Sequence, residues 1–149
     1  MSTPHSALLA RLEERSAVLG VIGLGYVGLP LAIEMARSGY RTIGFDVNEA
    51  VVRGLNAKQS HIQDVPSEHV AAYVSEGLFS ATTDLSRLAE CDAISVCVPT
   101  PLGKTKDPDL SFIMSAAKSL RAALRPGQLV ILESTTFPGT TREVLQPAL

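Results

Sequence analysis

The sequence has too few cysteines, too little net charge and too short an apolar run for several classes of protein. Its two cysteines, Cys91 and Cys97, make neither a disulfide framework nor a paired Cys-x-x-Cys metal site. The 13 Lys and Arg nearly balance the 15 Asp and Glu, and a net charge of −2 carries no signature of nucleic-acid or anionic-membrane binding. The longest apolar run, residues 17–25, is far shorter than the ~20 residues of a membrane span, and no secretory signal opens the chain. We therefore expect a soluble, cytoplasmic protein that binds neither nucleic acid nor membranes.

The length and the apolar pattern indicate one domain of alternating strands and helices. A chain of 149 residues matches a single domain of ~100–200 residues. Short apolar runs predict buried strands over residues 17–22 and 93–98, and further strands are predicted over residues 41–45, 79–81 and 128–132. Periodicity and end signals predict helices over residues 6–15, 26–38, 48–56, 67–77, 84–90, 109–124 and from Thr140 or Thr141 onward. This alternation is typical of the α/β class, and we expect a Rossmann-like doubly wound parallel sheet.

Three of the helices carry more specific expectations. The lead-in helix, within residues 1–15, has an apolar face predicted to consist of Leu8, Leu9 and Leu12. The helix over residues 26–38 has an apolar stripe predicted to consist of Val27, Leu31 and Met35. The last helix is expected to leave Val144 and Leu145 exposed, so we interpret residues 1–149 as one domain of a longer protein.

A glycine-rich segment, Gly23–Gly28 (GLGYVG), lies between the first predicted strand and the following helix. In that context its G-x-G-x-x-G pattern is typical of dinucleotide binding. Gly23 permits the tight turn, Gly25 lets a pyrophosphate approach the backbone, and Gly28 lets the helix pack closely against the strand. The free N–H groups of the first helical turn, which begins at about Tyr26, would face the phosphates. The alternative is a glycine turn that serves packing alone.

An acidic residue follows the second predicted strand, where a ribose-binding carboxylate is expected. Asp46 comes after Gly28 at close to the ~20 residues usual in dinucleotide-binding folds. Its charge would repel a 2′-phosphate ~4 Å away by about 1 kcal/mol in water and about 4 kcal/mol at an effective dielectric of 20. We therefore expect NAD rather than NADP, while Arg41 and Arg53 leave the NADP alternative open. Asp46 could also cap the helix that follows.

These motifs together resemble the UDP-glucose/GDP-mannose dehydrogenase family, in particular its amino-terminal NAD-binding domain. The family's GxGYVGxP opening is matched by residues 23–30. Further matches follow in the family's order: FDVN at 45–48, CVPTP at 97–101, DLS at 109–111 and ESTTFPGT at 133–140. The forms DPDLS and ESTTFPGTT are most similar to the UDP-N-acetylhexosamine 6-dehydrogenases, such as those acting on UDP-N-acetylglucosamine. One position departs, because the arginine that many relatives carry five residues after the ribose acid is Val51 here.

The resemblance implies a cofactor site and a reaction. The cofactor-binding residues that it implies are Gly23, Gly25, Tyr26, Val27, Gly28, Asp46, Val98, Pro99, Thr100, Pro101, Ser134 and Thr135. The implied reaction oxidises the C6 alcohol of a UDP-sugar to the uronate with two NAD, while a cysteine holds the intermediate as a thiohemiacetal. Residues 98–101 and 134–135 also follow strands, where α/β sheets bind ligands. The alternative for the proline-containing stretch is an ordinary turn by which the chain leaves the strand.

The family's nucleophilic cysteine lies in a later Cys-Phe motif that this sequence does not contain. Cys97 and Cys91 have apolar surroundings and no basic neighbour to stabilise a thiolate, so we interpret both as packing residues. Glu133 is either a general base or, as we favour, a carboxylate that orients neighbouring hydroxyls. The resemblance gives Thr135 a supporting catalytic role, holding a water or a substrate group. We expect no metal, because no ligand spacing joins the three histidines, His5, His61 and His69.

The sequence thus predicts the NAD-binding domain of a nucleotide-sugar 6-dehydrogenase, with catalytic and sugar-nucleotide-binding domains after residue 149. This chain alone would bind NAD without turnover, and the complete protein would be a homo-oligomer that acts on a UDP-sugar. One alternative is a stand-alone module that senses NAD(H) without catalysis. Another is a 2-hydroxyacid or 3-hydroxyacid dehydrogenase, which the Tyr26-Val27 and Leu29-Pro30 pairs disfavour.

Overall fold

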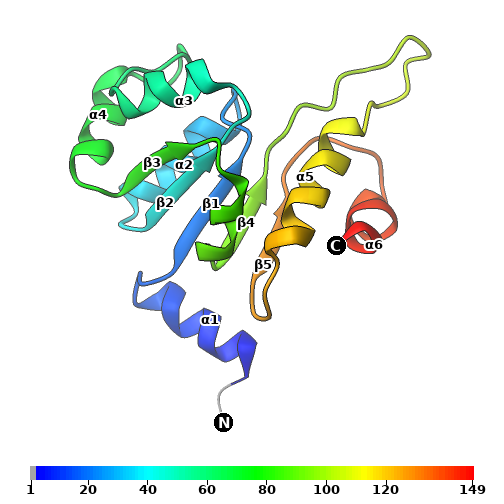
Figure 1. Cartoon of the computed structure of the whole chain (residues 1–149), viewed down its shortest axis with the longest axis horizontal. Helices are drawn as coiled ribbons and strands as arrows, with labels where there is room; N and C mark the ends of the chain where they lie inside the picture. The colour runs from blue at the N-terminus through cyan, green and yellow to red at the C-terminus, as the bar shows by residue number, and fades with distance from the viewer. Residues whose placement is uncertain (1–2) are drawn as a thin grey trace.

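The computed structural model describes residues 3–149 and is built around a five-stranded parallel sheet (Figure 1). The strands are β1 (Val18–Ile22), β2 (Arg41–Phe45), β3 (Phe79–Thr82), β4 (Ala93–Val96) and β5 (Leu129–Leu132). Their order across the sheet is β3-β2-β1-β4-β5, and each neighbouring pair runs parallel. The expected Rossmann-like doubly wound class is confirmed, with the change of direction between β1 and β4.

The helices cover both faces of the sheet. They are α1 (Pro4–Glu13), α2 (Gly28–Arg37), α3 (Glu49–Asn56), α4 (Ser67–Ser75), the 3₁₀ helix η1 (Leu85–Glu90), α5 (Ser111–Ala123), the π-helical turn η2 (Thr141–Leu145) and α6 (Gln146–Ala148). On one face α2, α3 and α4 share a buried cluster with Val21 of β1 and Phe79 of β3. On the other face η1 and α5 pack against Ile43 of β2 and Ile94 of β4. None of these helices, taken over residues 3–149, is both long and apolar enough to cross a membrane.

The helix α2 turns a different face to the core from the one the periodicity predicts. Its buried residues are Gly28, Leu29, Ala32, Ile33 and Ala36. Val27 is 60% exposed, while Leu31 and Met35 lie at the margin of the core. The predicted stripe was wrong for Val27, while Leu31 and Met35 pack only at the edge of the cluster because the helix lies close to the sheet, where glycine and alanine pack better than larger side chains.

The two ends of the chain also differ from expectation. Leu145 is 2% exposed and packs on Ile113 and Ala117 of α5, so the expectation of an exposed Leu145 was wrong. At the other end α1 forms as predicted, but none of its residues is fully buried and Leu9 is 48% exposed. An apolar face on α1 therefore contributes little to its attachment.

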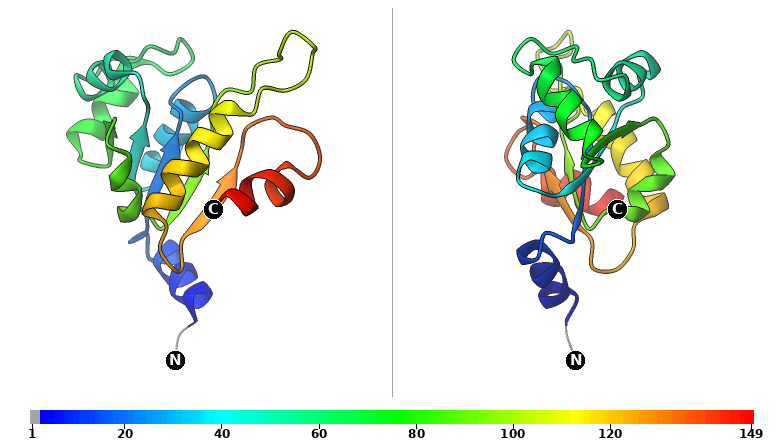
Figure 2. Two further views of the ribbon diagram at one scale, coloured as in Figure 1. Left: turned by 45° about the vertical axis from the view of Figure 1, so that its right-hand side comes forward. Right: turned by 90° about the vertical axis from the view of Figure 1, so that its left-hand side faces the viewer.

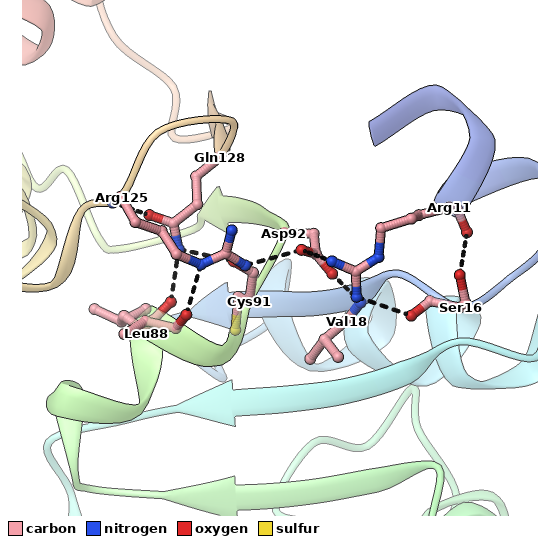
Figure 3. Close-up of polar contacts among 9 residues, drawn as sticks. Arg11, Ser16, Val18, Leu88, Cys91, Asp92, Arg125 and Gln128 are labelled. Carbon is pink, nitrogen blue, oxygen red and sulfur yellow. Dashed lines mark hydrogen bonds and ion pairs between the residues drawn. The ribbon is translucent and has the colours of Figure 1, made fainter. Parts of the chain in front are cut away.

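A buried carboxylate joins α1 to the sheet at the end opposite to the loop of residues 99–109 (Figures 2 and 3). The Asp92 side chain, only 4% exposed, accepts hydrogen bonds from Arg11 Nη1 at 2.6 Å and Arg125 Nη2 at 2.8 Å. Its second oxygen accepts from the backbone N–H of Val18 at 2.8 Å. Arg125 also donates to the carbonyl of Cys91 at 3.0 Å. One aspartate thus ties the lead-in helix, β1 and the turn before β5 together.

Candidate functional site

A cleft of about 580 Å³ opens at the carboxyl ends of the strands. Its walls come from the turns that follow β1, β2, β4 and β5, together with one face of α5. It lies where the strand order changes direction, which is where open α/β sheets bind their ligands.

The cleft brings together nearly all of the site residues predicted from the sequence. Those that line it are Gly23, Gly25, Tyr26, Val27, Asp46, Val98, Pro99, Thr100, Ser134 and Thr135. Gly28 and Pro101 do not line it. Gly28 is buried under the turn, and the Pro101 carbonyl accepts from the Asp109 N–H at 2.8 Å, at the base of the loop of residues 99–109.

The three glycines of the turn after β1 lie in different structural surroundings. Gly23 has φ +92, a left-handed conformation that favours glycine, and a Cβ there would lie 2.7 Å from the Cys97 carbonyl oxygen. A Cβ on Gly28 would lie 1.6 Å from the Gly23 carbonyl oxygen, so α2 could not approach the turn. A Cβ on Gly25 would meet no atom within 4 Å. Gly23 and Gly28 are required by the fold, whereas Gly25 borders open space in the cleft.

The start of α2 offers unpaired donors beside that open space. Over residues 3–149, no acceptor is found for the N–H groups of Gly25, Tyr26, Val27 and Gly28, and no side chain caps the helix. Free N–H groups and the positive end of a helix dipole favour an anion. Together with the room above Gly25, this arrangement fits the pyrophosphate of a dinucleotide.

Asp46 holds the glycine-rich turn from the neighbouring strand. One carboxylate oxygen accepts from the Leu24 N–H at 3.0 Å and the other from the Asn48 N–H at 2.9 Å. The cap of α3 is Asn48, whose side chain accepts from the N–H groups of Ala50 and Val51. The interpretation of Asp46 as a helix cap is therefore wrong. Its half-buried carboxylate still borders the cleft, where it can accept hydrogen bonds from ribose hydroxyls.

Two turns form the opposite wall and are tied to each other. The Thr100 hydroxyl donates to the Thr135 carbonyl at 2.6 Å, and the Ser134 hydroxyl donates to the Val98 carbonyl at 2.8 Å. Glu133 is exposed beside them, and within the described part of the chain its carboxylate accepts no hydrogen bond. The expectation that Glu133 orients these hydroxyls is not met, because both hydroxyls donate to backbone carbonyls.

The two thiols are buried and stay protonated near neutral pH. Burial, followed by the Glu133 charge, raises the pKa of the Cys97 thiol to about 11. Burial raises the pKa of the Cys91 thiol to about 12. Both residues pack in the core, as the sequence predicted. No group of three His, Cys, Asp or Glu side chains suited to a metal ion occurs among the described residues.

Several cleft residues were missed by the sequence analysis. His61, considered there only as a possible metal ligand, is solvent-exposed yet lines the cleft, with Nε2 2.7 Å from the Leu24 carbonyl oxygen. Phe112, Ser115 and Ser119 line it from α5. The spacing of these three along one helical face was a usable signal. His61 offered none, since its partner is far away in the sequence.

Comparison with known proteins points to one family. The sequence matches the UDP-glucose/GDP-mannose dehydrogenase family, NAD binding domain, over residues 17–149, which leaves α1 outside the match. It is 39% identical over 126 residues to a UDP-N-acetyl-D-mannosamine dehydrogenase of Salmonella typhi, covering 85% of this chain and 30% of that protein. It is 38% identical over 132 residues to a UDP-N-acetyl-D-glucosamine 6-dehydrogenase of Pseudomonas aeruginosa, covering 88% of this chain and 30% of that protein.

Solved structures show the same likeness. A ternary complex of GDP-mannose dehydrogenase from Pseudomonas aeruginosa superposes with a TM-score of 0.83 at 30% identity, covering 87% of this chain and 31% of that one. A UDP-glucose dehydrogenase from Pyrobaculum islandicum gives a TM-score of 0.83 at 34% identity, covering 89% and 32%. The chain thus spans about 30% of the length of the curated relatives that it matches.

Proposed function

The chain belongs to the UDP-glucose/GDP-mannose dehydrogenase family as its NAD-binding domain, and on that basis we propose that it is the cofactor-binding part of a UDP-sugar 6-dehydrogenase. The resemblance found in the sequence is confirmed, and it disfavours the hydroxyacid dehydrogenase alternative. The observation that carries the proposal is the cleft at the switch point, with unpaired N–H groups and open space at Gly25 on one side and Asp46 on the other.

The residues present fit NAD. We assign the pyrophosphate to the N–H groups just before α2, from Gly25 to Val27, and the adenosine ribose to Asp46. The turns at 98–101 and 134–135 would lie nearer the nicotinamide, where Thr135 would hold a water or a substrate group. NAD, when bound, supplies the acceptor for the hydride that leaves C6 of the sugar. The buried, protonated Cys97 and Cys91 do not provide the family's nucleophile.

The remaining parts of the activity belong to regions of the relatives that this chain does not match. We assign residues 1–149 to the cofactor domain, with residues 1–15 as its lead-in helix, and expect catalytic and sugar-nucleotide-binding domains to follow. The substrate we propose is UDP-N-acetylglucosamine or a similar UDP-sugar, because relatives named for UDP-N-acetylhexosamines share 38–39% identity with this chain. We further propose that the complete protein is a homo-oligomer and that it lies in the cytoplasm, where free thiols such as these remain reduced.

Two assays test the proposed function. The complete protein, given NAD and a UDP-N-acetylhexosamine or UDP-glucose, should form NADH, whereas residues 1–149 should bind NAD without forming any. A complete protein that forms no NADH with these substrates at any pH would contradict the dehydrogenase proposal. If it still binds NAD, the NAD(H)-sensing alternative would be supported instead.

The Asp46→Asn variant is expected to lose most of its discrimination against NADP. A charge beside the 2′-phosphate costs about 1 kcal/mol in water and about 4 kcal/mol at an effective dielectric of 20. Asp46 is half-buried, so an intermediate cost of about 2 kcal/mol corresponds to roughly a 30-fold change in the ratio of NADP to NAD affinity. Isothermal titration calorimetry with both dinucleotides measures that ratio.

The matched control is Glu49→Gln, which removes an exposed carboxylate from α3 outside the cleft. It should leave the ratio unchanged. An unchanged ratio in Asp46→Asn as well would show that Asp46 does not set the cofactor preference.

A further inference from the structure

A histidine outside the predicted motifs contacts the glycine-rich turn. His61 lies in the loop between α3 and α4, and its Nε2 is 2.7 Å from the carbonyl oxygen of Leu24. A carbonyl oxygen only accepts, so Nε2 carries the proton and donates. The contact therefore joins the loop of residues 57–66 to the turn after β1.

The loop that carries His61 is firmly attached to the core. Its Ile62 and Val65 side chains are each 5% exposed and belong to the cluster beneath α2, α3 and α4. The Ser60 hydroxyl donates to the Ile62 carbonyl at 3.0 Å and accepts from the Ile62 N–H at 3.1 Å. The Ser60 N–H donates to the Ser67 hydroxyl at 3.0 Å. The imidazole is thus presented from a fixed backbone.

Two side chains from different loops hold the peptide groups on either side of Leu24. Asp46 accepts from the Leu24 N–H, and His61 donates to the Leu24 carbonyl. In a trans peptide the C=O and the following N–H point in opposite directions in one plane, so a fixed Leu24 carbonyl fixes the direction of the Gly25 N–H. Gly25 itself has no side chain and no packing neighbour within 4 Å of a Cβ position to do so.

We propose that His61 is a positioning residue of the cofactor site, which orients the Gly25 N–H through the Leu24 carbonyl. The inference rests on the proposed NAD site. It gives the loop of residues 57–66 a role in binding the dinucleotide, although none of its residues belongs to the glycine motif.

The test compares three variants of His61 by NAD titration calorimetry. His61→Phe keeps a ring but loses the donor, and His61→Ala loses both; each should raise the dissociation constant for NAD about five-fold, the size of one ordinary hydrogen bond. His61→Gln places an amide N–H near the position of Nε2 and should restore the wild-type value within about two-fold. In NMR relaxation of the ligand-free protein, the order parameter of the Gly25 amide should fall in His61→Phe and recover in His61→Gln.

The control is His69→Ala, which removes an exposed histidine of α4 that does not line the cleft. It should alter neither measurement. If the wild-type chain does not bind NAD, the proposed function fails. If the wild type binds NAD and His61→Phe binds it equally well, or His61→Gln is as weak as His61→Phe, the positioning role is overturned while the NAD site stands.

Discussion

Replacing Gly25 by valine is expected to remove measurable NAD binding and to leave the melting temperature of the ligand-free chain unchanged. The position is exposed, and a Cβ there would meet no atom within 4 Å, so the variant should fold normally. The new side chain would occupy the space assigned to the pyrophosphate. If the pyrophosphate loses two charge-assisted hydrogen bonds to the N–H groups of the turn, the affinity for NAD falls at least about 100-fold. Calorimetric titration with NAD and thermal melts measure the two effects separately.

Gly28→Ala provides the contrast for this experiment. Its Cβ would lie 1.6 Å from the Gly23 carbonyl oxygen, so helix and turn must separate. Both the melting temperature and the NAD affinity should therefore fall. If Gly25→Val binds NAD like the wild type, the pyrophosphate does not approach Gly25, and our placement of the cofactor is wrong.

The Asp92→Ala variant is expected to lose about 3 kcal/mol of unfolding free energy. The carboxylate is 4% exposed and accepts hydrogen bonds from Arg11, Arg125 and the Val18 N–H. Removing one partner of a buried ion pair costs about 3–5 kcal/mol. The lower figure applies because the two arginine side chains are 45% and 39% exposed and can turn to water. Urea denaturation measures the change.

Two controls separate this effect from a general loss of structure. Arg11→Ala removes only the partner on α1 and should cost about 1 kcal/mol, since Arg125 and the Val18 N–H still pair with the carboxylate. The second control is NAD binding by the Asp92→Ala variant at a temperature where that variant is folded. Its affinity for NAD should equal that of the wild type, because Asp92 lies at the opposite end of the sheet from the cleft. A loss below about 0.5 kcal/mol, the range of an ordinary surface substitution, would contradict the role assigned to Asp92.

The sequence was most informative where a local pattern determines a local structure. Short apolar runs marked β1 and β4, whose residues are buried almost throughout, because strands buried on both faces tolerate few polar residues. The position of Asp46 followed from its spacing after Gly28, because β2 lies directly beside β1. The helix α2 was predicted, but the residues that it buries fully were not, because Ala32 and Ala36 count weakly in a hydrophobic pattern yet pack closely against the sheet.

The contacts that could not be predicted are those that join distant parts of the chain. The hydrogen bond from His61 to Leu24 spans 37 positions, and the ion pair between Arg11 and Asp92 spans 81. No periodicity relates such residues, and they meet only once the loops and the sheet are in place. The expected role of Glu133 failed for a similar reason, since the nearby hydroxyls donate to backbone carbonyls from other turns.

The burial of Leu24 links the affinity for the dinucleotide to the thermodynamics of folding. This residue lies within the glycine-rich turn, yet its side chain is fully buried in the same core cluster as α2, α3 and α4. The turn therefore exists in its binding conformation only in the folded state, and the unfolded chain has no comparable affinity. At a NAD concentration 100 times the dissociation constant, binding would stabilise the fold by about 2.7 kcal/mol. The fraction of this domain that is folded near its melting temperature would consequently rise and fall with the supply of NAD.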